Sequence, residues 1–231
     1  ELNTSCVPQK EFWGKHGRRF RPATVDELFL SSHIAYRTSH SVFYHAMLDG
    51  QAVLVQKLDF NGPETAAGVE KHLRLTRKLQ DTGTVPRLLG CFSRTNFHAL
   101  VVEPFGYNFV SAAKQFSMDD FLKMLTAFEA LSQVVMALHA EEIVLNLTEP
   151  RALGFIDGRF SRAVLLDLSE TCEKNKPCPL RSSALADPRR RQGQDARLEW
   201  DVYTLGVLFS AIELKGNLTG LAVPVRDTPK E

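Results

Sequence analysis

Leu138-His139-Ala140-Glu141-Glu142-Ile143-Val144 is the stretch on which the fold assignment depends. Its first two residues are the end of a long helix predicted over residues 119–139. This helix is apolar on nearly all sides and is therefore expected to be buried. A β-hairpin is predicted next, with strands over 153–156 and 163–166. A final, very apolar helix is predicted over residues 201–214.

The first half of the chain has the patterns of strands and of one amphipathic helix. The helix is predicted over residues 64–80, where leucines and Val69 recur among charged residues. The dipeptide Asp49-Gly50 is a hairpin turn signal between two of the strands. The strands are predicted over residues 42–48, 52–58, 87–92 and 98–103. Strands followed by helices predict an α+β fold with two lobes.

We divide the chain at two boundaries. Residues 1–23 are interpreted as an N-terminal extension, residues 24–103 as a β-rich first lobe, and residues 104–231 as a helical second lobe. The break Pro104-Phe105-Gly106 is the predicted hinge between the lobes, because proline and glycine interrupt regular structure.

The composition is that of an ordinary globular protein. The chain has 231 residues, a formal charge of +1, 44% hydrophobic and 24% charged residues. Such a balanced charge argues against a dedicated nucleic-acid binder. Because no run of 18 or more apolar residues occurs, we expect no membrane span.

Two features bear on the cellular compartment. Sequons begin at Asn3, Asn146 and Asn217, a mild excess over chance that fits a glycosylated secretory protein. Cys172 and Cys178 bracket a short polar segment and could close a disulfide loop, while the alternative is that all four cysteines are free thiols. The spacing of the cysteines lacks the pairs that a zinc site needs, so no metal site is predicted.

Four segments, taken in order, resemble motifs of the protein kinase superfamily. Residues 138–144 resemble the approach to the catalytic loop, and residues 164–169 resemble the strand before the metal-binding Asp-Phe-Gly. Residues 200–208 resemble the start of the F helix, and residues 53–58 resemble the third strand. The resemblance implies a two-lobed kinase-like fold. The second lobe is then expected to be reduced after the F helix, because few residues follow residue 214.

The nucleotide-binding positions that the resemblance marks in the first lobe are altered. The stretch 35–42, expected to be the Gly-rich loop, contains no glycine. Gln56 stands in the place of the phosphate-binding Lys, and alternation along a strand would turn the neighbouring Lys57 to the opposite face. His72 stands in the place of the partner Glu, and we interpret it as a helix-surface histidine without a role.

The catalytic loop is altered in the same way. Leu147 stands where the resemblance places the catalytic Asp, and its side chain cannot accept a proton. Glu149 replaces a phosphate-neutralising Lys, and Ala152 replaces the metal-binding Asn. Asp167 is the one catalytic group retained, and it is interpreted as a hydrogen-bond acceptor for the loop backbone. Asp201 is expected to brace the catalytic loop, as the matching residue does in the family.

Three hypotheses remain. The first is a catalytically inactive pseudokinase that binds no cofactor and serves as a scaffold or allosteric regulator for a protein partner. The second is a rewired kinase or nucleotide-binding enzyme using Asp167 and Lys57, and the third is an unrelated α+β binding domain. The basic run Arg189-Arg190-Arg191 is interpreted as a solvated loop rather than a partner site.

The general character of the chain also resembles the secreted pseudokinases of the apicomplexan rhoptry-kinase family. This resemblance implies secretion into a parasitophorous vacuole or cyst wall, and the alternative is a cytoplasmic protein.

Overall fold

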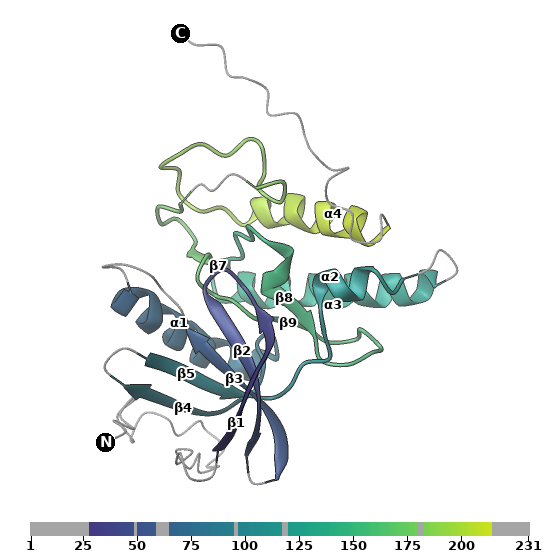
Figure 1. The fold of residues 1–231 in the computed structure, drawn as a ribbon. Coiled ribbons are helices and arrows are strands. Elements are labelled where there is room, and N and C mark those ends of the chain that lie inside the picture. Colours follow the sequence, from purple (N-terminus) through teal and green to yellow (C-terminus); the bar gives the residue numbers. More distant parts are fainter. Residues whose placement is uncertain are drawn as a thin grey trace.

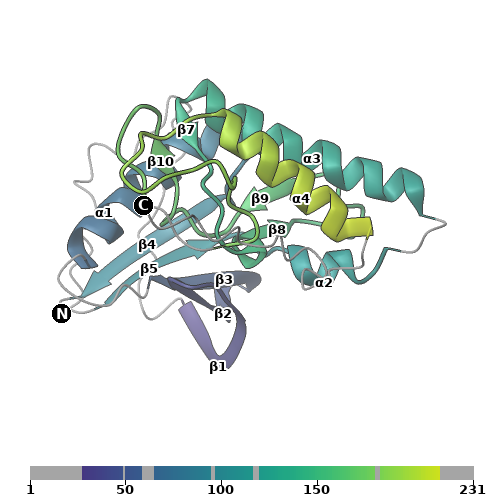
Figure 2. The same cartoon turned by 90° about the horizontal axis from the view of Figure 1, so that it is seen from above.

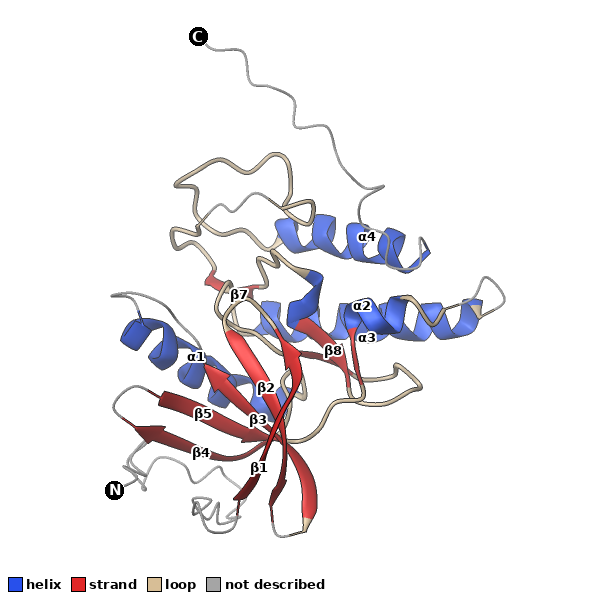
Figure 3. Cartoon of the chain, in the orientation of Figure 1, coloured by secondary structure: helices blue, strands red, loops and turns tan. Residues whose placement is uncertain are grey.

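The computed structural model describes residues 28–48, 50–58, 65–94, 97–116, 120–179 and 183–213. Figure 1 shows a twisted sheet in the first half of the chain and a largely helical second half. Figure 3 shows the same division by secondary structure, with long loops between β9 and α4. The fold is α+β, as the order of the sequence patterns predicts.

An antiparallel sheet forms the first lobe, with its strands in the order β1-β2-β3-β5-β4. Leu48 pairs with Gln51, which leaves the two residues of the predicted hairpin turn between β2 and β3. Gly50 has the positive φ of 74° that such turns require. The strands are β1 (Leu28–Arg37), β2 (Ser41–Leu48), β3 (Gln51–Leu58), β4 (Leu88–Arg94) and β5 (Phe97–Val102).

Helix α1 (Thr65–Leu79) lies against one face of this sheet (Figure 2). Its buried residues recur every three or four positions, which is the spacing of one helical face. Leu73 packs against a cluster that joins the sheet to the second lobe; its buried members are Phe43, Leu54, Leu88, Leu100, Val102, Val164 and Leu166. The two lobes therefore share apolar contacts beside the positions that the kinase resemblance assigns to nucleotide binding.

The second lobe combines helices with short strand pairs. Strands β6, β8 and β9 form one small sheet, and β7 pairs with β10. The elements are β6 (Tyr107–Asn108), α2 (Phe109–Ala113), α3 (Phe121–Ala140), β7 (Ile143–Val144), β8 (Leu153–Phe155), β9 (Ala163–Leu165), β10 (Cys172–Glu173) and α4 (Glu199–Glu213). Short 3-10 helices cover Gln80–Thr82 and Pro150–Ala152.

Helix α3 forms the centre of the second lobe. Its buried face packs in the largest core cluster with residues of α2, α4 and the small strands. The rings of Phe128 on α3 and Phe209 on α4 lie 4.8 Å apart, so the two helices are in direct contact. Among the described residues, α3 is also the one helix long and apolar enough to cross a membrane by length and composition alone. A buried core helix passes the same test.

The predicted helices and longer strands are confirmed, whereas β1, α2 and the two-residue strands were missed. Strand β1 escaped prediction because its pairing with β2 is irregular between Leu30 and Tyr36, and such irregularities break the alternation of side chains. Strands of two residues, such as β7 and β10, are too short to show any period.

Gly154 in β8 gives a direct test of the packing between the small strands of the second lobe. A Cβ at this position would lie 3.0 Å from Leu166 Cδ1 and 3.1 Å from the Tyr107 carbonyl oxygen. We expect Gly154→Ala to lower the free energy of unfolding by about 1–3 kcal/mol, because the carbonyl belongs to the paired strand β6. Urea unfolding followed by circular dichroism measures this change.

Gly206→Ala in α4 is the matched control. A Cβ there would meet no atom within 4 Å, and alanine is about 1 kcal/mol better than glycine inside a helix. This variant should therefore be more stable than the parent. A Gly154→Ala protein as stable as the parent would contradict the close approach of β6 and β8.

Candidate functional site

Gln56 on β3 lies at the position that the kinase resemblance assigns to the phosphate-binding Lys. Its side chain is buried, and its amide nitrogen donates to Ser41 Oγ and to the Leu166 carbonyl oxygen, both at 2.9 Å. These two bonds use both protons of the amide. Gln56 therefore joins β2 and β3 to the second lobe as an uncharged crosslink.

His72 on α1 faces Gln56 across this site, with its Nε2 atom 3.4 Å from the Gln56 amide nitrogen. The interpretation of His72 as a surface residue was wrong, because its side chain is only 2% exposed. Position 72 falls on the sheet-facing side of α1, between the buried residues Val69 and Leu75. Burial lowers the pKa of His72 to about 4, so the imidazole is neutral at physiological pH.

Lys57 occupies the other side of β3. Leu54 packs in the cluster that faces α1 and the second lobe, while Val53 and Val55 pack in a cluster on the opposite side of the sheet. Because side chains alternate along a strand, Lys57 lies on the side of Val53 and Val55. The regular pairing of β2 with β3 has no bulge that would rotate Lys57 towards Gln56.

The loop that resembles the catalytic loop is held from beneath by Asp201 of α4. The Asp201 carboxylate is fully buried and accepts the backbone N–H groups of Leu145 at 2.8 Å and Asn146 at 3.1 Å. His139 Nε2 also lies 2.9 Å from Asp201 Oδ2. The expected bracing role of Asp201 is therefore confirmed. In the loop that it braces, Leu147 and Ala152 are buried apolar side chains.

Asp167 is buried and fully engaged by hydrogen-bond donors. Its Oδ1 atom accepts from the Ser169 backbone at 3.0 Å, and its Oδ2 atom accepts from Thr38 Oγ1 at 2.6 Å and from the His40 backbone at 3.2 Å. Burial by itself raises the pKa of Asp167, but His72 and the bonds from Ser169 and Thr38 more than offset this and leave the pKa below its ordinary value.

A hollow remains between the loop at 145–152, the segment after Asp167, and Ser39 of the first lobe. Three of its lining residues are acidic, and none is basic. The lining consists of Ser39, Leu145, Leu147, Thr148, Glu149, Ala152, Asp167, Ser169 and Glu170, all within the described part of the chain. The carboxylates of Glu149, Asp167 and Glu170 would repel an anion in this hollow.

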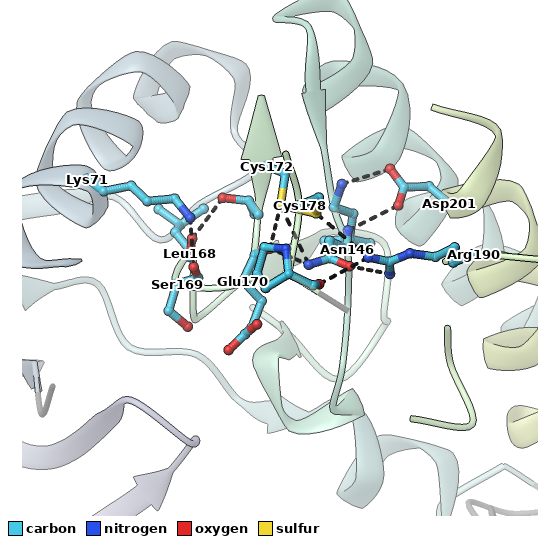
Figure 4. Close-up of a disulfide and its surroundings, with 12 residues drawn as sticks. Lys71, Asn146, Leu168, Ser169, Glu170, Cys172, Cys178, Arg190 and Asp201 are labelled. Atoms are coloured by element: carbon cyan, nitrogen blue, oxygen red, sulfur yellow. Dashed lines mark hydrogen bonds between the residues drawn. A yellow bond between two sulfur atoms is a disulfide. The ribbon is translucent and has the colours of Figure 1, made fainter. Parts of the chain in front are cut away.

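Asn146 lies beside the disulfide that joins Cys172 to Cys178 (Figure 4). Its amide nitrogen donates to the Glu170 carbonyl oxygen at 2.7 Å, and its amide oxygen accepts from Arg190. Glycosylation of Asn146 is therefore incompatible with this fold, because the side chain is 2% exposed and both ends are bonded. Asn3 and Asn217, the other two sequons, lie outside the described residues.

Arg190 corrects the interpretation of the basic run as a solvated loop. Its guanidinium lies 4.3 Å from the centre of the Trp200 ring and donates to the Pro179 carbonyl oxygen at 3.1 Å. Its neighbours Arg189 and Arg191 are exposed, as predicted, and Arg189 pairs with Asp187. Three-residue basic runs are usually solvated, so the sequence offers no signal that the middle residue is buried.

The sequence also offered no indication that Lys71 contacts the second lobe. It precedes His72 on α1 and donates from its Nζ atom to the Ser169 carbonyl oxygen at 2.8 Å, which ties α1 to the segment after Asp167. Burial lowers the pKa of Lys71. The sequence pattern of an amphipathic helix does not reveal this contact, because a lysine beside the apolar face looks like any solvated charge.

His72 makes the stability of the protein sensitive to acid. With a folded pKa of about 4 against an ordinary 6.5, His72 takes up a proton in the unfolded chain at a higher pH than in the folded chain. The stability that depends on neutral His72 is complete above pH 6.5 and is lost as the pH falls towards 4. We expect a loss of about 2 kcal/mol between pH 7 and pH 5 from this group.

Urea unfolding at pH 7 and pH 5 measures the effect in His72→Leu, which should lose about 2 kcal/mol less than the parent over this interval. His45→Gln is the control for loss of a histidine, because His45 is exposed on β2 and the variant keeps His72, so the loss that depends on His72 should remain. Equal losses in the parent and in His72→Leu would contradict the buried neutral state of His72.

Comparison with known proteins supports the fold. No protein-family model matches the sequence, and no curated protein matches it. Among solved structures, the chain is similar to a twitchin kinase fragment of C. elegans, described as an autoregulated protein kinase with immunoglobulin domains. The match has a TM-score of 0.67 and 15% identity, and it covers 84% of this chain and 45% of the twitchin fragment. The described chain therefore has a protein-kinase-like fold.

Proposed function

We propose that this protein is a catalytically inactive pseudokinase that binds no Mg-ATP and serves a protein partner as a scaffold or allosteric regulator. One observation carries the proposal: the hollow between the lobes is lined by Glu149, Asp167 and Glu170 and by no basic residue. Phosphoryl transfer depends on positioning the phosphates and neutralising their charge. This hollow presents negative charge where a phosphate group would need positive charge.

The contacts of the surrounding residues support the same proposal. The Gln56 amide is neutral and already bonded to Ser41 and Leu166, so it offers no charge to a phosphate. Leu147 stands where a catalytic base would be and cannot accept the proton of a substrate hydroxyl. With these groups changed, what the site retains of kinase chemistry is the single carboxylate of Asp167.

The alternative function is a rewired kinase that uses Asp167 for a metal ion and Lys57 for a phosphate. Three observations weigh against it. Lys57 lies on the side of β3 away from Gln56, and both oxygens of Asp167 accept hydrogen bonds from the chain itself. Within the described residues, no group of three or more histidine, cysteine or acidic side chains is close enough to hold a metal ion.

We further propose that the protein works in the secretory pathway or outside the cell. The disulfide between Cys172 and Cys178 supports this proposal, because disulfides persist mainly in oxidising compartments. The sequons at Asn3 and Asn217 are consistent with it, as is the general resemblance to secreted rhoptry pseudokinases. A mass measurement before and after deglycosylation of the secreted chain tests it, and Asn146 should carry no glycan.

A thermal-shift titration tests the absence of nucleotide binding. A ligand at ten times its dissociation constant stabilises a protein by about 1.4 kcal/mol, which shifts the midpoint by a few degrees. We expect no rise in Tm with millimolar ATP, with or without Mg²⁺. A Tm that increases with ATP concentration along a saturation curve would overturn this part of the proposal.

Transfer of radiolabelled phosphate distinguishes the rewired kinase from the pseudokinase. The parent protein should transfer no label to itself or to a mixed protein substrate. Asp167→Ala is the matched control, because any transfer catalysed by this site should disappear in that variant. Label transfer by the parent that vanishes in Asp167→Ala would establish the alternative function.

A further inference from the structure

The loop between β1 and β2 reaches across to the second lobe. The Thr38 backbone N–H closes the loop by donating to the Ser41 carbonyl oxygen at 2.9 Å. The next two backbone N–H groups, those of Ser39 and His40, donate to carboxylates of the second lobe instead. Ser39 N lies 2.6 Å from Glu149 Oε1, and His40 N lies 3.2 Å from Asp167 Oδ2.

Three side-chain contacts reinforce these two bonds. Thr38 Oγ1 donates to Asp167 Oδ2 at 2.6 Å, and His40 Nε2 lies 3.1 Å from Glu170 Oε1. At the end of β1, the Tyr36 hydroxyl donates to the Arg151 carbonyl oxygen at 2.8 Å. Every one of these contacts joins the first lobe to the second.

The negative charge of the acceptors explains why the N–H groups of the loop bond to them. Successive backbone N–H groups in a tight loop form a concavity that attracts anions. Glu149 and Asp167 supply carboxylates to those N–H groups, and bonds to ionised acceptors are about twice as strong as neutral ones. The chain thus fills with its own negative groups the donors that a bound anion would otherwise take.

Aromatic packing holds the same loop from the side of the hinge. The Tyr36 ring meets the Phe105 ring edge-on at 5.8 Å, and Phe43 meets Phe105 edge-on at 5.5 Å. Phe105 lies in the connection between β5 and β6, the predicted hinge. Burial, together with Glu149, raises the pKa of Tyr36, so its hydroxyl keeps the proton that it donates to Arg151.

We propose that Glu149 and Asp167 form a built-in latch that binds the β1–β2 loop to the second lobe and keeps the two lobes closed without any ligand. The latch is an autoinhibitory contact, because the loop N–H groups are not available to another anion while it is closed. It also gives the protein one fixed relation between its lobes. The latch stands independently of the proposed function, since a closed loop and an absent nucleotide site are measured separately.

Hydrogen exchange at the amides of Ser39 and His40 tests the latch directly, because these N–H groups are its donors. We expect both amides to be protected in the parent protein. In Glu149→Ala the Ser39 amide should exchange about 10-fold faster, and in Thr38→Val the His40 amide should exchange faster because its neighbour no longer anchors Asp167. The hydrogen bond from His40 to Asp167 is more buried than the one from Ser39 to Glu149. We therefore expect the larger protection in the parent at the His40 amide.

Glu173→Ala is the matched control. Glu173 forms an exposed ion pair with Arg74 and takes no part in the latch. The variant should leave exchange at Ser39 and His40 unchanged. The amide of Val101, which is fully buried in the interior strand β5, reports global unfolding in every variant, so a variant that merely loses stability is recognised by faster exchange there.

Two results would overturn the latch. One is exchange at Ser39 and His40 in the parent at the rate of an unprotected amide. The other is equal exchange at these amides in the parent, in Glu149→Ala and in Thr38→Val, with Val101 fully protected throughout. Neither result depends on whether ATP binds, so a nucleotide titration that contradicts the proposed function would leave the latch to be judged by exchange alone.

Discussion

The buried carboxylate of Asp201 fixes the loop on which the site between the lobes depends. It takes the backbone N–H groups of Leu145 and Asn146, so the loop that follows begins from one defined position. An unpaired carboxylate at zero exposure would be costly, and its three donors make its burial favourable. With this start held, Leu147 turns into the core and Glu149 turns towards the first lobe.

Gln56 and His72 form an uncharged contact at the positions where the kinase resemblance places a charged Lys and its partner Glu. Gln56 joins the sheet to the second lobe through Leu166, and its partner His72 is kept uncharged by burial. The Nδ1 atom of His72 has no hydrogen-bond partner among the described residues, which is a cost that apolar packing around α1 must offset. The protein thus keeps the geometry of an interlobe contact while carrying no charge there.

The sequence predicted the fold well where a local pattern was strong. The Asp49-Gly50 signal located a hairpin, and the apolar run before His139 located α3, because both depend on neighbouring residues. Residue spacing within β3 also predicted that Gln56, and not Lys57, would face the site. His72 was misjudged because its polarity was taken to indicate exposure, whereas its position three residues from Val69 and three from Leu75 places it on the buried face of α1.

Contacts between distant segments could not be predicted from the sequence. Arg190 looked like part of a solvated basic run, and Asn146 looked like a glycosylation site, yet the two side chains bind each other across 44 residues of sequence. Glu149 was judged by what it would do to a phosphate, and no pattern indicated that Ser39 would be its partner. Such pairings depend on how the two lobes meet, which no local period records.

The separation of the contacts at the β1–β2 loop has a consequence for how the chain folds. Thr38 and Asp167 are 129 residues apart, and Ser39 and Glu149 are 110 apart. Contacts between such distant residues form only after a large loop has been closed. The conformational entropy of that closure is therefore lost before the contact contributes any stabilisation. The β1–β2 hairpin can therefore form by local pairing, whereas its loop can dock only once the second lobe has folded. Docking of that loop would be among the last events in folding, and it would report that both lobes are complete.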